Sequence, residues 1–228
     1  MSSSLISGTS INAAPARAAR GKFISLEGGE GAGKSTLLAG LREYVEQHGI
    51  KLVQTREPGG TSLGEAVRGI VLDPARSDLA AESELLLMFA SRAQLVREVI
   101  EPALSAGQWV LCDRFADASY AYQGGGRGQP VQRIAELERW ACDGVKPDLT
   151  LLLDLPVATG RARAAGRGDA DRIEIEADSF FERVRASYRE RAAAEPQRFR
   201  VIDASHSPAA VLHEATLALA ALVEGSQA

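Results

Sequence analysis

Short apolar runs alternate along this chain with longer stretches in which apolar residues recur at helical spacing. Five runs predict buried strands, at residues 22–27, 51–55, 109–113, 148–154 and 199–203. The intervening stretches predict helices at residues 34–48, 62–72, 82–104, about 134–142, 175–194 and 208–223. Because the strands are apolar on both faces and alternate with helices, we expect a five-stranded parallel sheet with helices on both faces, a three-layer α/β/α fold. Strand 22–27 should lie at its centre.

Acidic residues stand at the ends of several predicted strands. Glu27, Asp113 and Asp154 are the last residues of the first, third and fourth runs. Right-handed crossovers place the carboxyl ends of parallel strands on one edge of the sheet, where ligands bind in folds of this kind. We therefore expect the functional residues to meet at this edge.

The first strand leads directly into a glycine-rich loop, and a helix follows the loop. The sequence matches the phosphate-binding pattern G-x-x-x-x-G-K-[ST]. The loop comprises Gly28, Gly29, Glu30, Gly31, Ala32, Gly33, Lys34, Ser35 and Thr36. Inward-pointing N–H groups of such a loop and the N-terminus of the helix bind phosphates. Lys34 can reach the outer phosphates of ATP, and the Ser35 hydroxyl can bind Mg²⁺.

Composition and charge narrow the class of protein. Of the 228 residues, 45% are apolar and 25% are charged, which is typical of a globular protein. The formal net charge of −4 provides no basic field for nucleic acid. No apolar run approaches the ~18 residues that a membrane span needs. Cys112 and Cys142 are the only cysteines, as expected of a reduced, cytoplasmic protein.

The first twenty residues differ from the rest of the chain. They are rich in Ser and Ala, contain arginine and have no acidic residue. This composition resembles a transit peptide, but it is also that of a disordered extension, which is the interpretation we favour. Residues 21–228 have the length of a single domain.

A P-loop by itself leaves several functions open. A Ras-type GTPase would carry an Asn-Lys-x-Asp motif, but the only asparagine is Asn12. A motor ATPase or helicase would have paired acids after its strands, whereas Arg114 follows Asp113. The remaining candidates are a small kinase, for a nucleotide or for an alcohol such as shikimate, and a nucleotide-dependent switch that binds a protein partner.

Four further blocks follow the P-loop and favour a kinase with a second nucleotide pocket. They are TREPGGT at 55–61, CDRF at 112–115, AYQGGGRG at 121–128 and RGDADRIE at 167–174. With the P-loop, these blocks resemble the bacterial thymidylate kinases over residues 22–203. The resemblance implies a nucleoside monophosphate kinase-like P-loop fold and transfer of the γ-phosphoryl group of ATP to dTMP, with Mg²⁺, giving dTDP and ADP for dTTP synthesis. It also implies a cytoplasmic homodimer with no membrane or nucleic-acid partner.

The resemblance assigns the second substrate, dTMP, to residues from all these segments. Arg68 and Arg114 would hold its phosphate, and Glu30 would meet its 3′-hydroxyl. Arg92 and Gln123 would read the thymine base. The implied dTMP site comprises Glu30, Glu57, Pro58, Arg68, Met88, Phe89, Arg92, Arg114, Ser119, Tyr122 and Gln123.

Three of these residues carry further expectations. Tyr122 would crowd the 2′ position of the sugar and favour deoxyribose. Many members of the family stack an aromatic ring on thymine from four residues before the base-reading arginine. Met88 occupies that position here and Phe89 follows it, and on a helix either side chain could cover the base. Outside the implied dTMP site, the resemblance assigns Asp113 to Mg²⁺, on which it would act through water.

The catalytic cations are expected from three places in the chain. Lys34 and Arg114 come from the P-loop and the third strand. Some thymidylate kinases carry an additional arginine inside the P-loop, but this chain has Gly31 there. A variant of the family with arginines in a lid, at about residues 161–174, would supply that charge from Arg167 with help from Arg163.

Overall fold

Five parallel strands form the central sheet in the part of the chain that the computed structural model describes, residues 20–165 and 170–227. The strand order is β2-β3-β1-β4-β5. The strands are β1 (Phe23–Gly28), β2 (Leu52–Arg56), β3 (Trp109–Asp113), β4 (Leu149–Asp154) and β5 (Phe199–Asp203). Each strand lies within one residue of its predicted range, and β1 is central. The predicted parallel sheet is confirmed.

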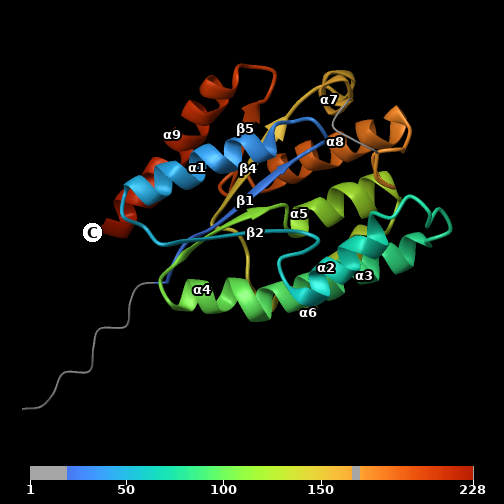
Figure 1. The fold of residues 1–228 in the computed structure, drawn as a ribbon, viewed down its shortest axis with the longest axis horizontal. Coiled ribbons are helices and arrows are strands. Elements are labelled where there is room, and N and C mark those ends of the chain that lie inside the picture. The colour runs from blue at the N-terminus through green and yellow to red at the C-terminus, as the bar shows by residue number, and fades with distance from the viewer. Residues whose placement is uncertain (1–19, 166–169, 228) are drawn as a thin grey trace, which may run out of the picture.

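Helices α1 (Lys34–Gln47) and α9 (Pro208–Gln227) pack side by side on one face of the sheet (Figure 1). Successive strand residues point to opposite faces. Ile24 and Leu26 of β1 point to this face, where they join a buried cluster with Leu37, Leu41 and Leu219. Burial of this cluster fixes α1, and therefore the loop that precedes it, against the end of β1.

The opposite face is covered by α3 (Ala81–Leu95), α4 (Glu101–Ser105) and α8 (Asp178–Ala194). Phe23 of β1 and Val110 of β3 pack there against the α3 and α4 side chains. Helices α2 (Ser62–Val71) and α6 (Val131–Cys142) pack on α3 (Figure 1). The three-layer arrangement is therefore confirmed.

The stretch predicted as one helix at 82–104 contains a change of hydrogen-bond pattern. The π-helical segment η1 (Val96–Ile100) separates α3 from α4. Pro102 lies in the first turn of α4. It has no N–H to donate to the Glu98 carbonyl, so a regular α-helix cannot continue through this region.

Two helical regions were absent from the predicted helices. One is α7 (Val157–Ala164), and the other is α5 (Ala116–Ser119) with the π-helical η2 (Tyr120–Gly126). Glycines disfavour a helix, but α8 packs too closely here for larger residues. A Cβ on Gly125 would lie 2.8 Å from the Arg183 carbonyl oxygen, and one on Gly126 would lie 2.4 Å from the Phe180 ring. Tertiary packing therefore overrides helix propensity at η2.

Two predicted segments extend beyond the described residues. Of the N-terminal extension, only Arg20 is described, and its guanidinium pairs with Asp148 at 3.1 Å. The predicted lid at 161–174 includes residues 166–169, so Arg167 lies outside the described residues. Within the described ranges, no helix is long and apolar enough to cross a membrane.

Candidate active site

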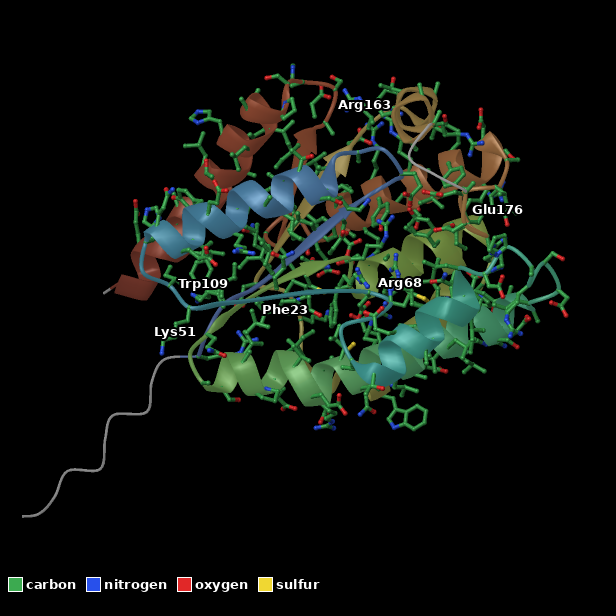
Figure 2. The ribbon with its side chains drawn as sticks, in the orientation of Figure 1. Phe23, Lys51, Arg68, Trp109, Arg163 and Glu176 are labelled. Atoms are coloured by element: carbon green, nitrogen blue, oxygen red, sulfur yellow. The ribbon has the colours of Figure 1, made fainter. Side chains whose placement is uncertain are left out.

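A cavity of about 400 Å³ opens at the carboxyl edge of the sheet. Arg68 lies toward the cavity end of the molecule (Figure 2). Phe23 and Trp109, the first residues of β1 and β3, lie at the amino ends of these strands, away from the cavity. The P-loop, the segments after β2 and β3, and parts of α2, α3 and η2 form its wall. The predicted site residues that line it are Glu30, Gly31, Ala32, Gly33, Lys34, Ser35, Thr36, Glu57, Pro58, Arg68, Met88, Asp113, Arg114, Tyr122 and Gln123.

The P-loop lysine lies inside the turn that its own loop makes. Lys34 Nζ donates to the carbonyl oxygens of Gly28 and Gly29, each at 3.0 Å. Removal from solvent and the nearby Arg114 charge lower the pKa of Lys34 to about 8. Phosphate oxygens would reverse this shift, because they supply the negative charge that the loop carbonyls only partly provide.

The conformation of the P-loop depends on close contact with α7. Gly31 has a φ of 71°, and a Cβ there would lie 1.9 Å from the Gly160 carbonyl oxygen. A Cβ on Gly160 would in turn lie 2.3 Å from the Glu30 carbonyl oxygen. This contact explains why an arginine in place of Gly31 does not fit this chain: both the left-handed backbone and the approach of α7 require glycine.

Arg114 is the centre of an ionic cluster between the P-loop and η2. Its guanidinium donates to Glu30 Oε1 at 2.6 Å, to the Gly28 carbonyl at 2.7 Å and to the Tyr122 hydroxyl at 3.1 Å. The Tyr122 hydroxyl also donates to Glu30 Oε1 at 3.2 Å. Although burial opposes ionisation, the charges of Arg114 and Lys34 lower the pKa of Glu30 to about 2. The cluster therefore holds an ionised Glu30 and an oriented Arg114.

The backbone at Arg114 is in the left-handed region, with φ at 70°. This conformation costs a non-glycine residue roughly 1–2 kcal/mol. Hydrogen bonds on both sides hold it: Arg114 N donates to the Leu26 carbonyl at 2.9 Å, and Phe115 N donates to Glu27 Oε1 at 2.7 Å. Strain of this kind persists where the surrounding structure fixes it, often at functional sites.

Glu27 lies at the functional edge, as its place at the end of the first predicted strand indicated, but it supports the site from behind and does not line the cavity. It is fully buried, and Tyr188 of α8 donates a hydrogen bond to its Oε2 at 2.7 Å. Burial and the charge of Asp117 raise the pKa of Glu27 to about 8. Glu27 and Glu30 are three residues apart in sequence, yet their pKa values are shifted in opposite directions.

Asp113 and Ser35 place side-chain oxygen atoms at the same edge. Both line the cavity, and Asp113 Oδ1 is buried without a hydrogen-bond partner among the described residues. An unpaired buried carboxylate oxygen next to a phosphate-binding loop is suited to Mg²⁺, which binds one or two protein oxygens and keeps several waters. In the described part of the chain, no three or more acidic, His or Cys side chains form a group that could hold a metal ion by themselves.

The β2–α2 segment is fixed by local hydrogen bonds. Thr61 caps α2 by accepting from Gly64 N at 2.9 Å, and Glu65 binds Gly60 N at 2.9 Å. Arg68, one turn further along α2, donates to the Pro58 carbonyl at 3.1 Å. These contacts direct Arg68 into the cavity, on the side opposite the P-loop.

Arg92 does not line the cavity. Together with Phe89 and Ser119, which contact it, Arg92 forms a supporting layer behind residues of the cavity wall. Its guanidinium is fully buried and binds both carboxylate oxygens of Glu57, with the shortest bond at 2.7 Å, and Ser119 Oγ at 3.0 Å. The Phe89 ring lies 4.5 Å from the Arg92 guanidinium carbon. Of the two residues considered for covering the base, Met88 lines the cavity, whereas Phe89 packs against Arg92. Ser119, like Phe89, lies in this supporting layer.

Glu84 is a residue of the site region that the sequence did not indicate. It is fully buried on α3, accepts from Gln123 Nε2 at 2.8 Å, and forms ion pairs with Arg127 and Arg172. Arg172 has acidic neighbours in the sequence, but its guanidinium reaches across to Glu84 and to the Val71 carbonyl. The spacing of Glu84 and Met88 by one helical turn on α3 was the only available signal.

Arg163 of α7 lies on the side of the P-loop away from Arg68 (Figure 2). It donates to the Ala204 carbonyl at 2.8 Å and to the Ser205 carbonyl at 3.4 Å. It lines a second cavity of about 350 Å³, together with the P-loop, His206 and Pro208. The P-loop therefore has a cavity on each side, and Arg163 belongs to the one remote from Gln123 and Met88.

Comparison with known proteins agrees with this geometry. A family model described as thymidylate kinase matches residues 26–215. The chain is 55% identical over 205 residues to thymidylate kinase of Alkalilimnicola ehrlichii, covering 90% of this chain and 94% of that protein. It is 54% identical over 204 residues to thymidylate kinase of Pseudomonas putida, covering 90% and 97%.

A solved structure also has the same fold. The crystal structure of thymidylate kinase from Ehrlichia chaffeensis matches with a TM-score of 0.73 and 32% sequence identity, covering 88% of this chain and 99% of that chain. These matches confirm the resemblance inferred from the sequence blocks. The chain belongs to the thymidylate kinase family.

Proposed function

We propose that this chain transfers the γ-phosphoryl group of ATP to dTMP, giving dTDP and ADP. The observation that carries the proposal is one cavity that joins the P-loop to Arg68 and Arg114 and extends to Met88 and Gln123. The P-loop suits the donor phosphates and the two arginines suit the acceptor phosphate. The depth of the cavity beyond them suits a nucleoside and is unnecessary for a small alcohol.

The donor would bind across the P-loop. Its adenosine end fits the second cavity, beside Arg163 and His206, so that the triphosphate passes over the loop toward Arg68. Lys34 would exchange the carbonyl oxygens of Gly28 and Gly29 for phosphate oxygens. Arg163 would therefore contact the donor nucleotide and not the transferred group.

The chemical step is an in-line displacement. A phosphate oxygen of dTMP attacks the γ-phosphorus, and the bond from that phosphorus to the β–γ bridging oxygen breaks, so ADP leaves with that electron pair. Negative charge accumulates on the transferred group, where Lys34 and Arg114 stabilise it. Because Glu30 and Tyr122 already orient Arg114, little reorganisation is needed at that moment.

We propose Ser35 and Asp113 as the residues that hold Mg²⁺, the latter through water. The ion would neutralise phosphate charge when it is bound with ATP. The support is the buried, unpaired Oδ1 of Asp113 beside the P-loop.

We also propose a cytoplasmic homodimer. Two free cysteines, Cys112 and Cys142, are consistent with a reducing compartment. Trp140 on α6 is 83% exposed and Leu86 on the adjacent α3 is 57% exposed. Exposed large apolar side chains on neighbouring helices are typical of a protein–protein contact.

A coupled assay of ADP release, with ATP, Mg²⁺ and a panel of acceptors, tests the proposed reaction. We expect dTMP to be preferred over dCMP, AMP, GMP and shikimate, and Lys34→Ala to lower kcat by at least ~10² while the protein remains folded. Equal kcat/KM for AMP and dTMP would overturn the acceptor assignment. Turnover by the Lys34→Ala variant at the unmodified rate would overturn the role of the P-loop.

A further inference from the structure

The side-chain amide of Gln123 has two different environments. Its Nε2 donates to Glu84 Oε1 at 2.8 Å. Its Oε1 is buried and accepts no hydrogen bond from any described residue. Gln123 lines the same cavity as the P-loop, Met88 and Arg68. A buried acceptor without a partner at a cavity wall indicates that a ligand supplies the missing donor.

Glu84 determines which end of the amide faces the cavity. A carboxylate accepts hydrogen bonds and donates none, so the Gln123 NH₂ group must point toward it. Arg127 and Arg172 hold this carboxylate in place, and Arg172 is itself bound to the Val71 carbonyl at 2.7 Å. Glu84 and Arg172 are both buried, so water does not compete for the hydrogen bonds between them.

We propose that Glu84 is a positioning residue that makes Gln123 an obligate hydrogen-bond acceptor for the acceptor base, and thereby selects bases with a ring N–H. This inference rests on the proposed function. Thymine and uracil carry a hydrogen on N3, which Gln123 Oε1 can accept. Cytosine has a bare N3, so two acceptors would face each other in the cavity.

Rotating the amide would suit cytosine but would break the contact with Glu84. The Gln123 oxygen would then face a carboxylate oxygen at hydrogen-bond distance, and both would lack a proton. Leaving buried polar groups unpaired is what makes a hydrogen-bonding site reject a wrong substrate. Selection against dCMP would therefore originate in Glu84, which accepts a hydrogen bond from Gln123, the residue that contacts the base.

The substitution Glu84→Gln tests the proposal. Arg127 and Arg172 would retain the amide oxygen of the substituted side chain, so its NH₂ group would face Gln123. The Gln123 amide would then rotate and present its own NH₂ group to the cavity. We expect kcat/KM for dTMP relative to dCMP to fall at least ~10-fold, with the dissociation constants from calorimetry moving in the same direction. The dUMP to dCMP ratio should fall in parallel, because uracil has the same ring N–H.

A second pair of variants serves if loss of the buried carboxylate alone prevents folding. Arg172→Met and Glu84→Gln/Arg172→Met differ only at position 84, and the double variant leaves no unpaired Arg172 charge. We expect Arg172→Met to keep the dTMP preference and the double variant to lose it. A purely structural role for Glu84 would lower activity toward dTMP and dCMP equally, and an unchanged ratio between this pair would overturn the proposal. Failure of the unmodified enzyme to prefer dTMP would instead overturn the proposed function.

Discussion

Two acidic residues on either side of a single turn have opposite ionisation in this protein. Glu30 faces Arg114 and Lys34, so its pKa falls to about 2, whereas the burial of Glu27 raises its pKa to about 8. The ionised Glu30 holds Arg114 in the cavity. The largely neutral Glu27 accepts from Phe115 N and fixes the backbone behind the same arginine. Opposite environments at neighbouring positions thus give one residue an electrostatic role and the other a structural role.

Glu27 makes the stability of the protein dependent on pH. Between about pH 4.5 and 8 the folded state binds this proton and the unfolded state does not, so the contribution of Glu27 to stability falls as pH rises through that window. Glu27→Gln is neutral at every pH and keeps an acceptor for Phe115 N. Relative to the unmodified protein, we expect this variant to gain roughly 4 kcal/mol between pH 5 and pH 9, about 1.4 kcal/mol for each pH unit up to the folded-state pKa.

Chemical denaturation at several pH values measures this difference. Asp117 also faces Glu27, but its pKa is lowered by its arginine partners, so its own effect falls at acidic pH, below this window. A stability difference between the two proteins that stayed constant from pH 5 to pH 9 would contradict the raised pKa of Glu27.

At the scale of the elements, the contact between the P-loop and α7 limits substitution. Gly31→Ala would place a Cβ against the Gly160 carbonyl and force a left-handed backbone on alanine. We expect it to lower the free energy of unfolding by roughly 1–3 kcal/mol and to weaken ATP binding. Gly29→Ala is the matched control for stability, because a Cβ at Gly29 meets no atom within 4 Å. Equal melting temperatures for the two variants would show that α7 does not constrain the loop.

The lid carries a prediction that rests on the sequence. Arg167 lies outside the described residues, and the position of Arg163 beside the Ala204 carbonyl leaves it remote from the acceptor cavity. Some members of the family have a P-loop arginine where this chain has Gly31. If the lid supplies that positive charge instead, Arg167→Ala should lower kcat at least ~10² with little change in the KM for dTMP. Arg163→Ala should instead raise the KM for ATP. A kcat for Arg167→Ala within a few-fold of the unmodified value would exclude this mechanism.

At the scale of the whole molecule, Trp140 and Leu86 expose apolar surface, and neither residue lines the catalytic cavity. Trp140→Glu would place a charge on α6, the helix that packs on α3. If this face joins two copies, sedimentation should give twice the 24.2 kDa chain mass for the unmodified protein and about one chain mass for the variant. Trp140→Phe keeps an apolar side chain and should remain a dimer. Identical masses for all three proteins would remove this face as the dimer contact.

Much of the fold could be predicted from the chain because its signals are local. Each strand is an apolar run bounded by polar residues, and the P-loop requires a particular strand, turn and helix in succession. The order of the blocks also identified the family and most residues of the cavity wall, including Lys34, Arg114 and Gln123. Helix η2 was missed because its glycines disfavour helix, and only the approach of α8 explains them.

The sequence by itself determined the phosphate-binding loop, the parallel sheet and the two-substrate character of the site, since these depend on residue type and order. The tertiary structure decided which side chains reach the cavity and which support it. Met88 and Phe89 are adjacent in sequence, yet one lines the cavity and the other packs on Arg92. Glu84 acts on Gln123 from 39 residues away. Such pairings depend on how α3 packs against η2, and burial then sets the charge and orientation of each group.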